Sequence, residues 1–88
     1  MEKEVIDLFE KTFNETIESI EKVSASGSNR KYLRLISKNH RCIGAYNEDC
    51  KENKAFISYA KQLKANGINV PTIYAEDLNH NVYLQQDL

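Results

Sequence analysis

Large apolar residues near the start of the chain recur every three or four positions. Five of them share one face at these spacings: Ile6, Phe9, Phe13, Ile17 and Ile20. The opposite face carries acidic residues, so the pattern predicts an amphipathic helix over residues 2–22. Small and polar residues follow over residues 24–29, and this composition predicts a loop.

Alternation of apolar and polar residues replaces the helical spacing after this loop. Residues 31–37 alternate with Leu33 and Leu35 on one side, which predicts a strand. Residues 41–46 follow a short Asn-His turn and are predicted to return as the antiparallel partner of that strand. A first strand is expected around residues 22–25.

A second helix is predicted over residues 50–66. Asp49 followed by Glu52 has the form of a capping box, although Asn47 is a rival N-cap. Gly67 suits the left-handed position after the last turn. Four side chains are expected to pack this helix on a sheet: Phe56, Tyr59, Ala60 and Leu63.

Two further short strands complete the pattern, over residues 72–75 and 82–86. The order of elements is therefore helix, hairpin, helix and hairpin. This order predicts an α+β fold, in which a single antiparallel sheet carries an N-terminal helix and one packed helix. The length of 88 residues fits one small domain that spans residues 1–88.

Composition narrows the classes of function. Hydrophobic residues make up 41% and charged residues 28%, which is ordinary for a globular domain. A net charge of −1 argues against a strongly basic nucleic-acid module, and no apolar run approaches the roughly 20 residues that span a bilayer. The two cysteines form no CxxC motif, neither histidine has a second ligand at metal spacing, and the N-terminus is acidic. A reduced, cytoplasmic protein without a metal site is therefore expected.

Charge is distributed unevenly along the chain. Residues 1–23 carry seven acidic and three basic side chains, whereas residues 24–41 carry five basic side chains and no acidic one. A positive block of this kind can meet an anionic ligand such as a phosphate. Alternatively, its lysines and arginines keep the edge of a sheet soluble.

Three stretches of the chain resemble one known family. They are ASGSNRKYLRL (residues 25–35), KQLKANGINVPTIYAED (residues 61–77) and VYLQQDL (residues 82–88). The first is similar to a small-residue loop followed by Arg-x-Tyr-x-Arg-Leu, the second to a helix end followed by Val-Pro, and the third to a strand that runs into Asp-Leu-Gly. Together they resemble the N-terminal lobe of the aminoglycoside phosphotransferase and choline kinase-like family, which has the protein-kinase-like fold. Within that family the closest resemblance is to bacterial amino-sugar kinases of the N-acetylmuramate type.

The resemblance implies the ATP-binding lobe of a small-molecule phosphotransferase. In such a lobe a loop lies over the nucleotide phosphates, and small side chains let its backbone N–H groups approach the anion. The nucleotide-binding residues implied in this loop and at its exit are Ser26, Gly27, Ser28, Asn29 and Arg30. Alternatively, this stretch is an ordinary turn between two elements.

One departure from the kinase pattern concerns the third strand. Kinases carry a lysine there that pairs with the nucleotide phosphates and with a glutamate on the following helix. Residues 41–46 contain no lysine, so the phosphate-pairing residue stays unassigned. Glu52 is the candidate for the helix glutamate, with the alternative that it only completes the capping box.

In that family the catalytic and metal-binding residues lie on a C-terminal lobe, outside these 88 residues. The ending in Gln86-Asp87-Leu88, directly after a strand, leads us to expect a piece of a longer protein. The chain alone is then expected to be non-catalytic, to bind ATP and magnesium weakly or not at all, and to form a homodimer through apolar surface near its end. The alternative is a small interaction or nucleic-acid-binding module that uses the basic hairpin over residues 30–41.

Overall fold

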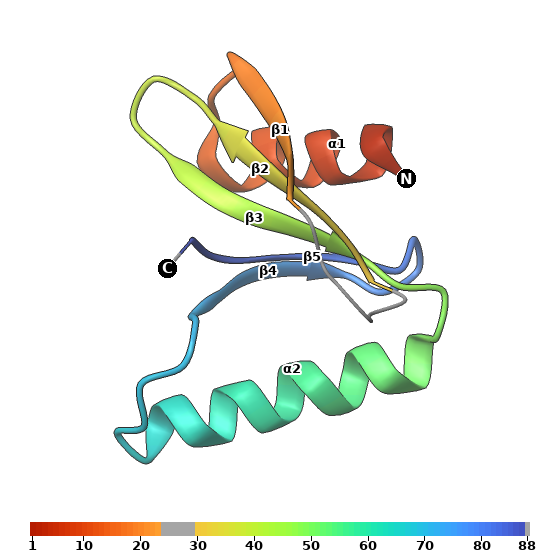
Figure 1. Cartoon of the computed structure of the whole chain (residues 1–88), viewed down its shortest axis with the longest axis vertical. Coiled ribbons are helices and arrows are strands. Elements are labelled where there is room, and N and C mark those ends of the chain that lie inside the picture. Colours follow the sequence, from red (N-terminus) through yellow and green to blue (C-terminus); the bar gives the residue numbers. More distant parts are fainter. Residues whose placement is uncertain (24–29, 88) are drawn as a thin grey trace.

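The computed structural model describes residues 1–23 and 30–87. Its elements in chain order are α1 (Glu2–Phe13), β1 (Ser19–Val23), β2 (Lys31–Ile36), β3 (Arg41–Tyr46), α2 (Cys50–Ala65), β4 (Ile73–Asp77) and β5 (Val82–Gln86) (Figure 1). Within these described ranges, neither helix has the length and apolar character needed to cross a membrane.

The five strands form one antiparallel sheet in the order β1-β2-β3-β5-β4. The last strand of the chain, rather than the fourth, lies beside β3. It suits this inner place because Val82, Tyr83 and Leu84 are all buried, whereas β4 alternates between exposed and half-buried residues, as an edge strand does. The predicted α+β fold, with one antiparallel sheet and two helices, is confirmed.

The first helix is shorter than the sequence pattern predicts. It ends at Phe13, because Asn14 adopts the left-handed conformation with φ 55° and its N–H bonds back into the last turn. The next segment forms β1, paired with β2, so the prediction of one helix over residues 2–22 is wrong. The first strand was expected around residues 22–25 and begins earlier. Four β-branched residues in this segment favour a strand although their spacing imitates a helix: Thr16, Ile17, Ile20 and Val23.

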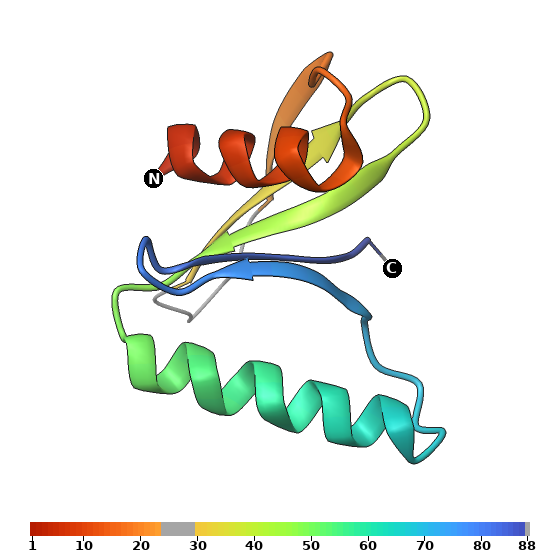
Figure 2. The same ribbon diagram turned by 180° about the vertical axis from the view of Figure 1, so that it is seen from behind.

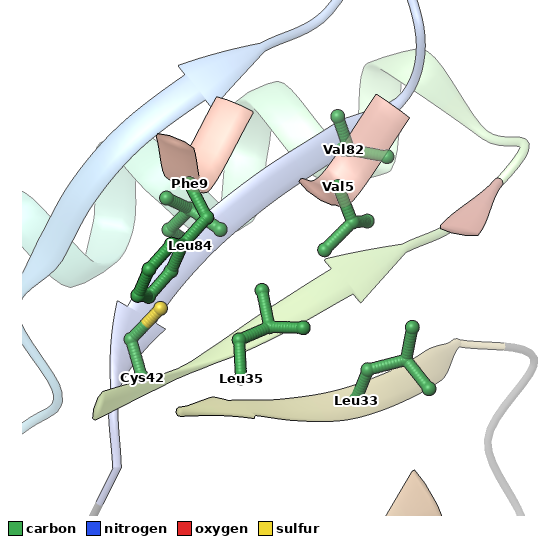
Figure 3. Close-up of a cluster of buried hydrophobic side chains, with 7 residues drawn as sticks. All are labelled: Val5, Phe9, Leu33, Leu35, Cys42, Val82 and Leu84. Atoms are coloured by element: carbon green, nitrogen blue, oxygen red, sulfur yellow. The ribbon is translucent and has the colours of Figure 1, made fainter. Parts of the chain in front are cut away.

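The two helices lie on opposite sides of the sheet (Figure 2). The core on the α1 side consists of Val5, Phe9, Leu33, Leu35, Cys42, Val82 and Leu84 (Figure 3). The core on the α2 side consists of Ala45, Ile57 and Tyr83, with Tyr32, Phe56, Ile73 and Leu78 partly buried against them. Successive residues of a strand point to opposite faces, which is why neighbours in β5 belong to different cores.

Both ends of α2 match their sequence signals. Asp49 is the N-cap, and its Oδ1 accepts a hydrogen bond from the N–H of Glu52 at 3.0 Å. At the other end Gly67 is left-handed with φ 79°, and the N–H of Ile68 donates to the carbonyl of Leu63 at 3.0 Å. These bonds satisfy backbone groups that the helix itself leaves without partners.

The face that α2 buries is only partly the predicted one. Ala60 is buried as expected, but Tyr59 is 62% exposed, so that part of the prediction is wrong. Asn53 and Ile57 are buried instead. Burial of Asn53 is tolerated because its amide donates a hydrogen bond to the carbonyl of Asn47 at 2.8 Å.

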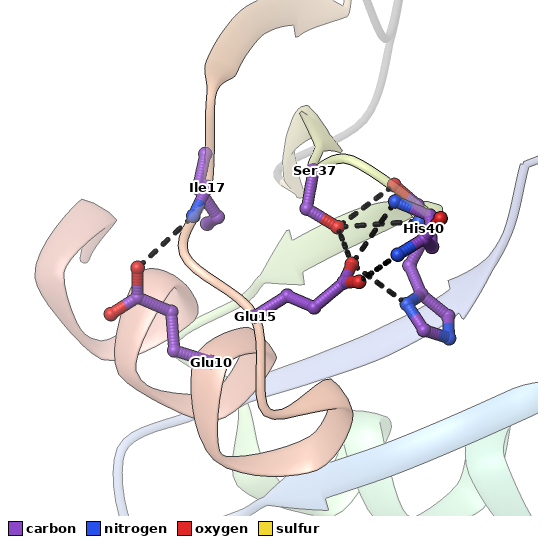
Figure 4. Close-up of polar contacts among 6 residues, drawn as sticks. Glu10, Glu15, Ile17, Ser37 and His40 are labelled. Atoms are coloured by element: carbon purple, nitrogen blue, oxygen red, sulfur yellow. Dashed lines mark hydrogen bonds and ion pairs between the residues drawn. The ribbon is translucent and has the colours of Figure 1, made fainter.

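Glu15 fastens the connection between α1 and β1 to the turn between β2 and β3 (Figure 4). Its carboxylate accepts hydrogen bonds from the Ser37 hydroxyl and from the backbone N–H of Asn39 at 3.1 Å, and it lies 2.9 Å from Nδ1 of His40. The His40 ring also stacks on Phe13, with 4.4 Å between the ring centroids. Hydrogen bonds from Ser37, His40 and Asn39 lower the pKa of Glu15 from its ordinary 4.5 to about 2.

Replacing Glu15 with glutamine is expected to make the fold less sensitive to acid. Because the folded-state pKa lies below 4.5, the carboxylate's contribution to stability is complete above about pH 4.5 and is lost as the pH falls toward 2. Thermal unfolding followed by circular dichroism should therefore show Tm falling less steeply with acid for Glu15→Gln than for the wild type. Glu18→Gln, which removes an exposed carboxylate from the same segment, is the control. Equal slopes for the wild type and Glu15→Gln would contradict this role.

Candidate functional site

The start of β2 and the first turn of α2 bring two of the predicted site residues together. Nη2 of Arg30 lies 3.4 Å from Oε1 of Glu52. The Arg30 guanidinium also lies over the ring of Phe56, 4.8 Å from its centroid. The side chain of Arg30 is only 14% exposed, whereas that of Glu52 is 55% exposed. The pair therefore joins a nearly buried cation to a carboxylate at the surface.

Local structure explains where the two members of this pair lie. Arg30 directly precedes β2, two residues before Tyr32, so both side chains belong to the face of the sheet that α2 covers. On α2, the N–H of Asp49 donates to Oδ1 of Asn47 at 3.3 Å. The reciprocal half of the capping box is thus made by Asn47, and the carboxylate of Glu52 pairs with the arginine instead.

Aromatic rings form the buried side of the site. The Tyr83 ring is buried, with its centroid 5.6 Å from that of Phe56. Burial raises the pKa of the Tyr83 phenol to about 12, and the positive charge of Arg30 opposes part of this rise. Because the Tyr83 ring is fully buried, its surroundings are poorly solvated, and an electrostatic contact with the guanidinium is stronger there than in water.

An open depression of about 430 Å³ adjoins the pair, and it is lined by Arg30, Glu52, Ala55, Phe56 and Tyr59. Among these lining residues, Arg30 is the one cation. A guanidinium presents planar N–H donors that match phosphate or carboxylate oxygens, so the arrangement suits an anionic ligand.

The structure tests the predicted site only in part. Arg30 and Glu52 come together, whereas Ser26, Gly27, Ser28 and Asn29 lie outside the described residues. Sequence reasoning assigned Phe56 and Tyr59 to packing and missed their place beside the glutamate. A signal was available, because the four- and three-residue spacing of positions 52, 56 and 59 places a carboxylate and two rings on one side of a helix.

The other arginines of the basic hairpin are also paired with carboxylates. Nε of Arg34 and Nε of Arg41 lie 2.7 and 2.8 Å from Oδ2 of Asp87. Nη1 of Arg34 lies 3.1 Å from Glu21. Hydrogen bonds from Arg34 and, to a lesser degree, from Arg41 lower the pKa of Asp87, although burial opposes this shift. These carboxylates neutralise much of the positive block, which argues against the alternative of an open basic surface for nucleic acid.

The surroundings of Cys42, His40 and His80 fit residues that support the fold. Cys42 is a buried core residue, and burial raises the pKa of its thiol to about 12. His40 and His80 lie in exposed turns, each beside a single carboxylate. In the part of the chain that the structure describes, no group of three or more His, Cys, Asp or Glu side chains could hold a metal ion.

No family model, curated protein or solved structure matches the chain. The fold, the geometry of the site and the sequence motifs are the features of this chain that bear on its function. The strongest of these observations is the arginine–glutamate pair beside the depression.

Proposed function

We propose that this chain is the N-terminal, ATP-binding lobe of a phosphotransferase that acts on an amino sugar or a related hydroxyl compound. Kinases present their nucleotide-binding parts in a set order, which is a loop over the phosphates, a third strand and a helix with a glutamate. Here small residues over 25–29 precede β2, α2 directly follows β3, and Glu52 lies in the first turn of α2. This order of parts on one antiparallel sheet supports the proposal.

The Arg30–Glu52 pair carries the proposal. Catalysis of phosphoryl transfer is mainly a matter of positioning the phosphates and stabilising their charge. In kinases a lysine paired with the helix glutamate supplies part of this stabilisation. The pair in this chain has the same chemical character, and it borders a depression that is open to ligand.

ATP with magnesium is the cofactor that the proposal implies. The guanidinium of Arg30 fits a phosphate group in charge and in hydrogen-bonding geometry. The described residues contain no carboxylate cluster for a metal ion, so we assign magnesium binding and catalysis to a C-terminal lobe, as in the resembling family. The assignment of an amino sugar as the phosphate acceptor follows from the three sequence motifs.

Replacing Glu52 with glutamine is expected to impair phosphoryl transfer in the protein made from the complete reading frame. Loss of the charge that orients Arg30 should lower kcat/KM for ATP by about tenfold or more. The measurement is transfer of labelled γ-phosphate from ATP to amino sugars, N-acetylmuramate among them. Glu21→Gln is a matched control, because Glu21 also pairs with an arginine and is 54% exposed. This control should change kcat/KM by less than about twofold.

Two results would overturn the proposed function. One is a reading frame that stops directly after the codon for Leu88, because a lobe of this kind does not act alone. The other is a complete protein that folds but transfers no phosphate from ATP to any sugar or small hydroxyl compound.

A further inference from the structure

We propose that Arg30, which directly precedes the second strand, is the cation that binds the nucleotide phosphates in place of the lysine that the third strand lacks. This inference rests on the proposed function and names the residue that holds its nucleotide. It assigns to one side chain a role that kinases give to a side chain on a different strand.

The third strand cannot supply the cation toward α2. Its residues on that face are Arg41, Ile43 and Ala45. The charge of Arg41, at the far end of the strand from Ala45, is paired with Asp87 at 2.8 Å, and Ile43 and Ala45 are 7% and 0% exposed. In the sheet register Ala45 lies between Tyr32 and Tyr83, so apolar and aromatic groups occupy the place where a lysine would extend. On this face of the sheet, the cation that lies beside the helix glutamate is Arg30.

The position of Arg30 suits it to a phosphate because its guanidinium is held before any ligand arrives. Its charge is paired with Glu52 at 3.4 Å and lies over the Phe56 ring at 4.8 Å. Both contacts restrict the side chain and so reduce the ordering cost that a ligand would otherwise have to offset. A guanidinium has five N–H donors in a fixed plane, so it can serve a carboxylate and a phosphate at the same time.

The depression sets the direction from which a phosphate would approach. Arg30 forms one wall, and Glu52 with Phe56 and Tyr59 forms the helix side. Because the glutamate is more than half exposed, water screens its charge, and its main effect on the site is to hold the guanidinium in place.

Nuclear magnetic resonance of the protein made from the complete reading frame tests this assignment. The Nε–Hε signal of Arg30 should shift on titration with Mg-ATP and with tripolyphosphate at millimolar concentrations, and it should not shift with adenosine. Arg30→Met should raise the dissociation constant for Mg-ATP by about tenfold or more, as expected for loss of a charge-assisted hydrogen bond. Lys31→Met is the matched control, because it removes the same charge from the next residue, on the opposite face of the strand. This control should change the dissociation constant by less than about twofold.

The outcomes separate this inference from the proposed function. If Mg-ATP binds equally well to Arg30→Met and Lys31→Met, or leaves the Arg30 signal unshifted, Arg30 is not the phosphate-binding cation. The proposed function is then tested by the sugar kinase assay alone. If Arg30→Met does not fold, the shift of the Arg30 signal in the wild-type protein still tests the inference. Glu52→Gln provides a second test, because it keeps the arginine but should weaken Mg-ATP binding.

Discussion

Replacing Phe9 with alanine is expected to lower the free energy of unfolding by about 3–5 kcal/mol. Phe9 is fully buried, and it shares a core with Val5, Leu35 and Leu84. Its ring attaches α1 to the sheet, and alanine would leave a cavity that the rigid strands cannot close. Because a small domain has a total stability of about 5–15 kcal/mol, this single change should remove much of it.

Urea unfolding at neutral pH measures this loss. Tyr59→Ala is the control, because it removes an aromatic ring of similar size that is 62% exposed. It should change the free energy of unfolding by no more than about 0.5 kcal/mol. A loss below about 1 kcal/mol for Phe9→Ala would mean that α1 does not pack on the sheet in solution.

Adding one methyl group at Gly44 is expected to destabilise the same core by overpacking it, whereas Phe9→Ala leaves a cavity. Gly44 lies in β3 between Leu33 and Leu84 in the sheet register. A Cβ at this position would overlap Cγ1 of Val5 on α1 and lie 3.1 Å from Cδ1 of Leu35. Val5 is β-branched and cannot turn aside easily, so α1 would have to move. Gly44→Ala should therefore cost about 1–3 kcal/mol of unfolding free energy.

A double-mutant cycle identifies the cause. Val5→Ala removes the methyl group that collides with the new Cβ, so Val5→Ala with Gly44→Ala should be more stable than the sum of the single changes by about 0.5–3 kcal/mol. The control pairs Val5→Ala with Gly67→Ala, because Gly67 has φ 79° and no atom within 4 Å of an added Cβ. That second pair should be additive within about 0.5 kcal/mol. Additivity in the Gly44 pair as well would show that α1 does not approach β3 as closely as described.

The sequence by itself determined the features that depend on residues near one another in the chain. The capping bond from Glu52 to Asp49 and the left-handed Gly67 are local, so their signals were sufficient to place α2. The strands over residues 41–46 and 82–86 also follow from their own apolar patterns. A class with one antiparallel sheet and two helices could therefore be predicted.

The tertiary structure decided what short patterns leave ambiguous. Apolar residues between positions 13 and 23 fit a helix as well as a strand, and pairing with β2 settled that choice after α1 had ended at Phe13. The packing of α2 on the sheet likewise leaves Tyr59 exposed and buries Asn53, whose amide donates a hydrogen bond to the carbonyl of Asn47.

For the candidate site too, the sequence determined one part and the tertiary structure the other. Arg30 and Glu52 could be named from motifs, but only the packing of α2 on the sheet brings their charges within 3.4 Å. The pairing of Asp87 with Arg34 was not predicted, because their hydrogen bond joins residues 53 positions apart. Contacts between residues so far apart in the sequence depend on which faces of the sheet and helices are buried together, and a local pattern of residue types does not contain that information.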